Sequence, residues 1–282
     1  MPRPGMEVER LATVQAGDER YRELQLARFG VSVLKQAKWR ELSRAAGGVR
    51  GKRALDLGTD NGVISWLFRA KGGDWDSADL TPHAVRAISR VLGEVVEETD
   101  GTRLPYPDGT FDLIVVADML EHVADDRGLL TEIARCLKVG GRAVLNVPHR
   151  KPWGVLHPVR RALGLTDAWH GHLHSGYDAA SLRALLPATL ELRETHEYVR
   201  FFSYALDTAL NAASGRATPA TSGRTAKGAI PLNSRDLGQV SGAVRMMYPF
   251  MRAFAALDAL LPFTHGYMLV ATLERTPGAR EA

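Results

Sequence analysis

The sequence predicts an α/β protein whose core is a mostly parallel sheet. Short apolar runs alternate with helical stretches between residues 53 and 147, and this alternation is typical of βαβ units. The clearest strand is 111–117, because the run from Leu113 to Val116 is consecutively apolar, as a strand buried on both faces requires. A short apolar run at 53–57 follows a helical stripe and marks where the sheet begins.

The remaining elements follow from periodicity and turn residues. Gly30 divides the first helical stretch, Pro82 suits the first turn of a helix, and Gly140-Gly141 is expected to close the helix at 125–138. The predicted strands are residues 53–57, 75–80, 94–99, 111–117, 142–147, 189–199 and 267–273. The predicted helices are residues 18–46, 62–70, a helix from 82, 125–138, 178–186, 201–213 and 240–261, with a long loop at 149–177.

Length and composition indicate one large globular domain, or one domain plus an appendage. The chain has 282 residues, of which 45% are hydrophobic and 24% charged, as is ordinary for a folded domain. We expect a helical cap at 1–50, a catalytic unit at 51–200 plus 264–275, and a helical insertion at 201–263. Within this insertion, the polar and basic stretch 214–229 is expected to be mobile.

Cysteine and charge content exclude several classes of protein. Cys136 is the only cysteine, so neither an internal disulfide nor a zinc site with several thiolates can form. The formal net charge is +4, but the arginines are scattered, so a solvated surface is favoured over a nucleic-acid site. We see no signal-like start and no apolar run of membrane-spanning length, so a cytoplasmic location is expected.

The segment from Ala54 to Gly62 combines a strand, a glycine-containing turn and the start of a helix. A tight β-to-α turn explains the glycines without any ligand, and a nicotinamide dinucleotide site is another interpretation. However, a pyrophosphate prefers backbone amides without carboxylates nearby, and here Asp56 and Asp60 flank the turn. Their charges suit a cofactor that carries an ammonium and a sulfonium, as S-adenosylmethionine does.

Two more acids follow the next predicted strands. Asp79 ends the second strand, where a carboxylate can accept hydrogen bonds from both ribose hydroxyls. Capping of the helix that begins near Pro82 is the alternative role for Asp79. Asp100 follows the third strand and is a candidate for the adenine amino group, whereas Pro107-Asp108-Gly109 is explained as a surface turn.

Together these segments resemble the class I S-adenosylmethionine-dependent methyltransferase superfamily, especially its large group of small-molecule enzymes. The resemblance covers residues 52–147, with weaker similarity to residue 199 and at 266–274. It is carried most specifically by the strings LPYPDGTFD at 104–112, DMLEHV at 118–123 and LKVGGR at 137–142. It implies a Rossmann-like sheet of seven strands in the order 3-2-1-4-5-7-6, with the seventh strand antiparallel.

The resemblance also implies which residues hold the cofactor, namely Asp56, Gly58, Asp79, Asp100 and Asp118. With their neighbours in the same turns, the expected S-adenosylmethionine site comprises Asp56, Gly58, Thr59, Asp60, Gly62, Asp79, Leu80, Asp100, Gly101 and Asp118. The chain departs from the family pattern at Asp60, where a glycine is usual. Because aspartate tolerates positive φ better than most residues, we expect the turn to persist.

Histidines are the candidates for catalysis, because methylation of a hydroxyl commonly uses a base and neutral histidine suits that task near pH 7. The candidate bases are His122 after the fourth strand, His149 after the fifth, and His172. His172 alternates with His170 and His174, and one strand face could present all three to a metal. We favour a loop that contacts the substrate and expect no metal.

The expected function is methylation of a small-molecule acceptor, at oxygen rather than at nitrogen or carbon. Residues 117–120 read ADML and lack the Asn/Asp-Pro-Pro-aromatic motif of nucleic-acid amino-methylation, and Cys136 falls inside a helix, which disfavours cysteine-dependent carbon methylation. The alternatives are a degenerate cofactor-binding or interaction protein, and an enzyme for an apolar or lipid-linked acceptor. In the last case residues 201–263 would meet a membrane or a second subunit.

Overall fold

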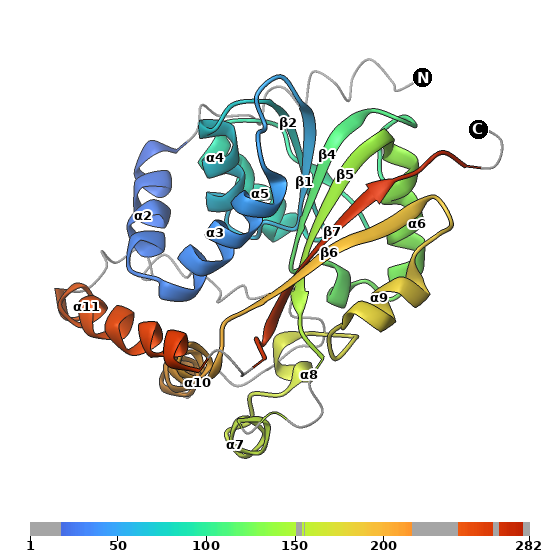
Figure 1. The fold of residues 1–282 in the computed structure, drawn as a ribbon. Helices are drawn as coiled ribbons and strands as arrows, with labels where there is room; N and C mark the ends of the chain where they lie inside the picture. The colour runs from blue at the N-terminus through green and yellow to red at the C-terminus, as the bar shows by residue number, and fades with distance from the viewer. Residues whose placement is uncertain (1–17, 151–153, 155, 216–241, 262–264, 279–282) are drawn as a thin grey trace.

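A seven-stranded sheet forms the centre of the protein (Figure 1). The computed structural model describes residues 18–150, 154, 156–215, 242–261 and 265–278. The strand order is β3-β2-β1-β4-β5-β7-β6, and β7 runs antiparallel to both of its neighbours, which confirms the predicted topology. The strands are β1 (Arg53–Leu57), β2 (Asp74–Asp79), β3 (Glu97–Glu98), β4 (Phe111–Ala117), β5 (Leu137–Pro148), β6 (Leu190–Tyr198) and β7 (Met268–Arg275).

Helices cover both faces of this sheet (Figure 1). On one face, α3 packs against β4, β5 and β7 while α4 packs against β2, and on the other face α6 and α9 pack against β5 and β6. The helices before β6 are α2 (Glu19–Gly30), α3 (Val33–Ala46), α4 (Val63–Ala70), α5 (Pro82–Leu92), η1 (Leu120–His122), α6 (Asp126–Cys136), α7 (His157–Ala162), α8 (Asp167–His170) and α9 (Ala179–Leu185). The predicted break of the first helix near Gly30 is confirmed, because Ser32 caps a separate α3.

Strand β4 explains why the sheet has two cores. Ile114 and Val116 belong to the apolar cluster beneath α6, whereas Leu113 and Val115 belong to the cluster that holds Leu42 of α3. All of these side chains are fully buried. Burying this much apolar surface on both faces is the main driving force for the layered arrangement.

Two predicted element boundaries were wrong. The helix predicted to run to 138 and close at Gly140-Gly141 ends at Cys136, and both glycines lie inside β5. Leu137 instead pairs with Phe111 of β4, and a Cβ on Gly141 would lie 2.7 Å from the Lys138 carbonyl oxygen. The strand predicted at 94–99 is reduced to Glu97–Glu98, because it pairs with β2 at the sheet edge over two residues only.

Two helices stand between β6 and β7, namely α10 (Phe201–Gly215) and α11 (Gly242–Ala256), followed by η2 (Leu257–Leu260). The Asp258 carboxylate of η2 accepts hydrogen bonds from the backbone N–H groups of Phe202 at 2.7 Å and Ser203 at 3.2 Å. Asp258 therefore caps α10 from a distant part of the chain. Most of the stretch predicted to be mobile, from residue 216 onward, lies outside the described residues.

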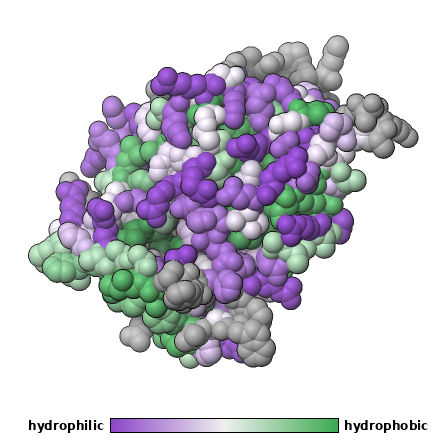
Figure 2. All heavy atoms as spheres, viewed as in Figure 1, coloured by the Kyte–Doolittle hydropathy of each residue, from purple (hydrophilic) through white to green (hydrophobic). Residues whose placement is uncertain are grey.

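The outer face of α11 is apolar and exposed. Met246 and Phe250 of α11 and Leu260 of the following η2 keep 68%, 67% and 72% of their surface accessible, and Figure 2 shows apolar surface gathered over α11 and α10 at the lower left. Exposed apolar patches commonly mark contact sites.

Candidate active site

A cavity of about 740 Å³ opens at the carboxyl ends of β1, β4 and β5, the edge at which open α/β sheets bind ligands. The turn after β1 forms one wall, and the loops after β4 and β5 form another. Helix α3, residues 157–172 and α10 contribute the remaining walls. Of the predicted cofactor residues, Gly58, Thr59, Asp60 and Asp118 line this cavity, as do all three candidate bases.

The turn after β1 has the backbone that its sequence predicts. Gly58, Asp60 and Gly62 adopt φ values of 75°, 61° and 78°, so aspartate is accommodated where a glycine is usual. Gly62 has a second constraint, because a Cβ there would lie 3.0 Å from Ile88 Cα on α5. The turn therefore brings α4 and α5 together and directs the backbone of residues 58–61 toward the cavity.

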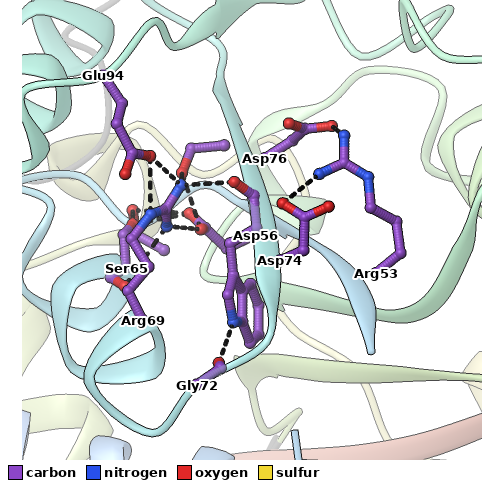
Figure 3. Close-up of polar contacts among 11 residues, drawn as sticks. Arg53, Asp56, Ser65, Arg69, Gly72, Asp74, Asp76 and Glu94 are labelled. Carbon is purple, nitrogen blue, oxygen red and sulfur yellow. Dashed lines mark hydrogen bonds and ion pairs between the residues drawn. The ribbon is translucent and has the colours of Figure 1, made fainter. Parts of the chain in front are cut away.

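Asp56 does not face the cavity. Its carboxylate is fully buried and forms an ion pair of 3.0 Å with Arg69 of α4, and it accepts hydrogen bonds from Ser65 Oγ at 2.7 Å and Ser77 Oγ at 2.8 Å (Figure 3). Burial raises the pKa of the Asp56 carboxyl, although Arg69 and the two serines favour its charged form. The expected contact of Asp56 with the cofactor ammonium is therefore corrected: this carboxylate joins β1, β2 and α4.

Asp79 supports the same turn from β2. Its fully buried carboxylate accepts the backbone N–H of Asp60 at 3.3 Å and that of Leu80 at 2.7 Å. The alternative that Asp79 caps the next helix is wrong, because Thr81 is the N-cap of α5. Leu80 packs partly against the sheet core. The ribose contact of Asp79 stays a prediction.

Asp100 and Gly101 form a turn after β3. The Asp100 carboxylate accepts hydrogen bonds from the backbone N–H of Thr102 at 2.9 Å and from its hydroxyl at 2.6 Å. The hydrogen bond from the Thr102 hydroxyl is the first reason that the pKa of Asp100 is lowered. Gly101 has φ 80°, and a Cβ there would lie 2.8 Å from Val123. Contact of these residues with adenine stays a prediction.

Asp118 forms a partly buried polar junction in the cavity wall that no sequence pattern indicated. It follows β4 with φ 50°, and its two carboxylate oxygens contact Lys38 Nζ of α3 and Asn146 Nδ2 of β5. Burial lowers the pKa of Lys38, but the ion pair with Asp118 outweighs it, so the pKa is raised overall. Tyr198 completes the junction by donating its hydroxyl to Asn146 Oδ1 at 2.5 Å.

The alternating histidines do not share one face. The imidazole of His172 lies 5.0 Å from that of His122 and 5.3 Å from that of His170, and all three line the cavity. His174 instead places Nε2 2.9 Å from the Val123 carbonyl oxygen. Burial lowers the pKa of His172 and lowers that of His170 to about 4, so both imidazoles are neutral near pH 7.

His149 occupies a separate part of the same cavity wall. Its Nδ1 lies 2.9 Å from the Gly266 carbonyl oxygen, and a carbonyl can only accept, so Nδ1 carries the proton and donates it. Nε2 is then the basic nitrogen. The structure therefore brings all three candidate bases to one cavity, but places His122 and His172 together and His149 apart from them.

Several cavity residues were missed from the sequence, notably Glu121, Arg160 and Tyr204. Arg160 is buried, pairs with Asp207 of α10 at 2.9 Å and places Nη2 3.0 Å from His170 Nε2. Tyr204 stacks on Tyr267 with ring centroids 3.7 Å apart. The Glu-His pair at 121–122 was noted for its histidine alone, and no local pattern could have joined α7 to α10.

The sheet order, the glycine turn after β1 and the cavity beside it define the class I methyltransferase fold. Residues 55–145 match the family described as methyltransferase domain. A methyltransferase described as S-adenosylmethionine-dependent, from Mesorhizobium loti, superimposes with a TM-score of 0.51 at 17% identity, covering 85% of this chain and 98% of the other. Residues 55–145 of the chain therefore match a methyltransferase domain, and the sheet around them has the class I methyltransferase fold.

The chain is also similar, over part of its length, to methyltransferases whose names refer to quinones. A demethylmenaquinone methyltransferase of Mycolicibacterium paratuberculosis is 34% identical over 38% of this chain and 46% of its own length. A ubiquinone biosynthesis O-methyltransferase of Dechloromonas aromatica is 29% identical over 39% of this chain and 50% of its own length. The chain thus spans about half the length of the curated relatives it matches. Among the described residues, no helix has the length and apolarity to cross a membrane.

Asp56→Asn should lower the free energy of unfolding by about 3 kcal/mol or more, because it leaves Arg69 without its buried counter-charge. Denaturant unfolding of the purified protein measures the change. The matched control is Asp74→Asn, which weakens an exposed ion pair with Arg53 and should cost no more than about 1 kcal/mol. Equal losses for the two variants would contradict a structural role for Asp56.

Proposed function

We propose that this protein transfers the methyl group of S-adenosylmethionine to an oxygen atom of a small-molecule acceptor. The observation that carries the proposal is that one cavity contains both the turn after β1 and three candidate bases. Proximity of this kind supplies much of the rate enhancement in methyl transfer, since the reacting groups are held in line. The domain match at 55–145 and the names of the relatives support the same reaction class.

The donors around the turn fit this cofactor better than they fit a dinucleotide. Asp60 lines the cavity at the turn after β1, and its carboxylate favours a ligand with ammonium and sulfonium charges over a pyrophosphate. In the proposed complex, the backbone of Gly58 to Asp60 holds the amino-acid part. Asp79 holds the ribose and the turn at Asp100 the adenine.

The bound cofactor supplies an electrophilic methyl group, and the chain supplies position and a proton acceptor. His149 is the base we favour, because its Nδ1–H is held by the Gly266 carbonyl oxygen and its Nε2 can accept the hydroxyl proton. Bound S-adenosylmethionine would supply its methyl group to the acceptor oxygen and would be released as S-adenosylhomocysteine.

Asp79→Ala should weaken binding of S-adenosylhomocysteine by roughly 10- to 150-fold, since hydrogen bonds to a charged group contribute about 1.5–3 kcal/mol each. Isothermal titration calorimetry measures this, with thermal unfolding as the test of folding. Asp76→Ala on the same strand, which loses a contact with Arg53, is the control. A change below threefold, or tighter binding of NAD than of S-adenosylhomocysteine, would refute the proposed cofactor site.

His149→Ala should lower turnover by about 10²–10⁴-fold and leave cofactor affinity unchanged, as expected for loss of a general base. Formation of S-adenosylhomocysteine from a panel of hydroxylated acceptors gives the rate. The control is His265→Ala, which changes an exposed histidine beside Glu197. This variant should turn over at about the rate of the unchanged protein. Absence of turnover with every acceptor, despite tight cofactor binding, would favour an interaction protein with a methyltransferase fold.

The exposed face of α11 favours an apolar or lipid-linked acceptor as the second candidate. Helix α11 packs against α10, whose Tyr204 and Asp207 line the cavity, so the apolar face lies close to the wall of the site. Arg245 and Arg252 are exposed on the same helix, and cations beside an apolar face favour contact with anionic membranes. A membrane-bound acceptor would then enter from the side of α11.

The double variant Met246→Ser/Phe250→Ser should reduce binding to anionic phospholipid vesicles by at least about tenfold. Two apolar side chains that become buried in the membrane together contribute more than about 1.4 kcal/mol to the binding free energy. Vesicle co-sedimentation measures the bound fraction. Val95→Ser/Val139→Ser, which changes exposed residues on other elements, is the control. Equal sedimentation of both double variants would contradict membrane contact through α11, and a concentration-dependent dimer lost in the first variant would indicate a second subunit there instead.

A further inference from the structure

We propose that Glu121, His122 and His172 bind one divalent transition-metal ion in the cavity wall, with Zn²⁺ as the best fit. One ligand atom from each residue lies within 4.8 Å of the others. Two imidazole nitrogens and one carboxylate oxygen form a ligand set that Zn²⁺ uses in catalytic sites, where a fourth position stays open. This site departs from our expectation that the histidines bind no metal.

The backbone places His172 beside Glu121 before any ion arrives. The N–H groups of Leu173 and His174 both donate to the Glu121 carbonyl oxygen, at 2.8 and 3.2 Å. On the other side of His172, the Gly171 carbonyl oxygen lies 3.0 Å from His122 Nδ1. The loop 171–174 is therefore fastened to residues 121–122 on both sides of His172, and this lowers the entropic cost of assembling three ligands from two distant segments.

Hydrogen bonding also selects the ligand atom of His122. Because a carbonyl only accepts, His122 Nδ1 donates its proton to Gly171 and Nε2 carries the lone pair. This arrangement is the usual one for a metal-binding histidine, whose second nitrogen donates to a carbonyl or carboxylate. Nε2 is also the atom that lies 4.0 Å from Glu121 Oε1, so the lone pair points toward the carboxylate side of the cluster.

The third ligand provides an independent observation. His172 Nδ1 is buried in the cavity wall and has no hydrogen-bond partner among the described residues, although buried polar atoms in folded proteins are nearly always satisfied. The His170 ring stacks on His172 at an interplanar angle of 24° and limits its rotation. A metal ion would satisfy His172 Nδ1 without any movement of the backbone.

Charge and distance are compatible with an ion at this position. The Glu121 side chain is 1% exposed, and a carboxylate so deeply buried is stabilised by a nearby positive charge. Ligands about 2.1 Å from a tetrahedral ion lie about 3.4 Å apart, and adjustment of the Glu121 and His122 side chains would close the remaining difference from the present 4.8 Å limit.

The catalytic role of the ion rests on the proposed methyl transfer. The existence of the metal site does not depend on that proposal. An acceptor hydroxyl at the open position would lose its proton more readily, as water does on Zn²⁺. The hydroxyl proton would pass to solvent, the oxygen would form its bond to the methyl carbon of bound S-adenosylmethionine, and the carbon–sulfur bond would break to release S-adenosylhomocysteine. The acceptor class is then a molecule with a hydroxyl that can coordinate a metal directly, such as a phenol.

Metal content of the full chain tests the site. The protein is freed of metal with a chelator and titrated with ZnCl₂ by calorimetry, and bound metal is counted by plasma mass spectrometry. We expect one Zn²⁺ per chain, a rise in thermal stability on binding, and visible absorption when Co²⁺ is used instead. His172→Ala and Glu121→Gln should each weaken binding at least about 10- to 100-fold, whereas His83→Ala, an exposed histidine on α5, should bind as the unchanged protein does.

The controls separate this site from the proposed function. Absence of saturable Zn²⁺ binding, or equal affinity in His172→Ala, would overturn the metal site. S-adenosylhomocysteine binding is measured on the same samples, so a folded protein that binds the nucleoside and no metal would leave methyl transfer standing. Conversely, Zn²⁺ binding without binding of the nucleoside would retain the metal site and refute the proposed reaction. Glu121→Gln keeps the shape of the side chain, so its loss of metal cannot be ascribed to a packing defect.

Discussion

The buried ion pair between Asp56 and Arg69 is the interaction on which the site depends most directly. It joins the last part of β1 to α4, and Ser77 of β2 donates to the same carboxylate. These three elements flank the turn at 58–62, so the contact fixes the angle at which the chain leaves the sheet. A charge pair at this depth costs desolvation energy that only well-oriented partners offset, and Asp56 has them in Arg69, Ser65 and Ser77.

From this turn, two independent supports extend toward the cavity. Asp79 of the neighbouring strand β2 accepts a hydrogen bond from the backbone N–H of Asp60 and so stabilises the turn after β1. Lys38 of α3 reaches Asp118 at the end of β4, and Asn146 of β5 contacts the same carboxylate. Neighbouring strands thus present acids at one edge of the sheet, each held by contacts from another element. Such pre-organisation lowers the cost of ligand binding, since few groups remain to be ordered.

The opposite wall of the cavity is formed by helices and loops outside the sheet. Arg160 of α7 pairs with Asp207 of α10 and contacts His170, so it links the loop after β5 to the helix after β6. The stacking of Tyr204 on Tyr267 adds a contact between α10 and the chain just before β7. In the proposed enzyme this wall contacts the acceptor rather than the cofactor, and it is where relatives that share the sheet can differ in substrate, because function depends on sites carried by a common fold.

The sequence by itself determined the sheet and the turn, because both depend on local patterns: apolar runs such as 113–116 predict buried strands, and Gly58, Asp60 and Gly62 permit positive φ. It also predicted that His122 follows the fourth strand and His149 the fifth, as the structure has them. Only the tertiary structure decided what Asp56 contacts. The local sequence around a carboxylate near the end of a strand is the same whether the side chain faces a cavity or a buried arginine. Likewise, Lys38 contacts Asp118, which lies 80 residues away in the sequence. His172 lies beside Glu121 because the next two residues of its loop donate hydrogen bonds to the Glu121 carbonyl oxygen. These contacts arise from packing between distant segments, and no periodicity along the chain encodes them.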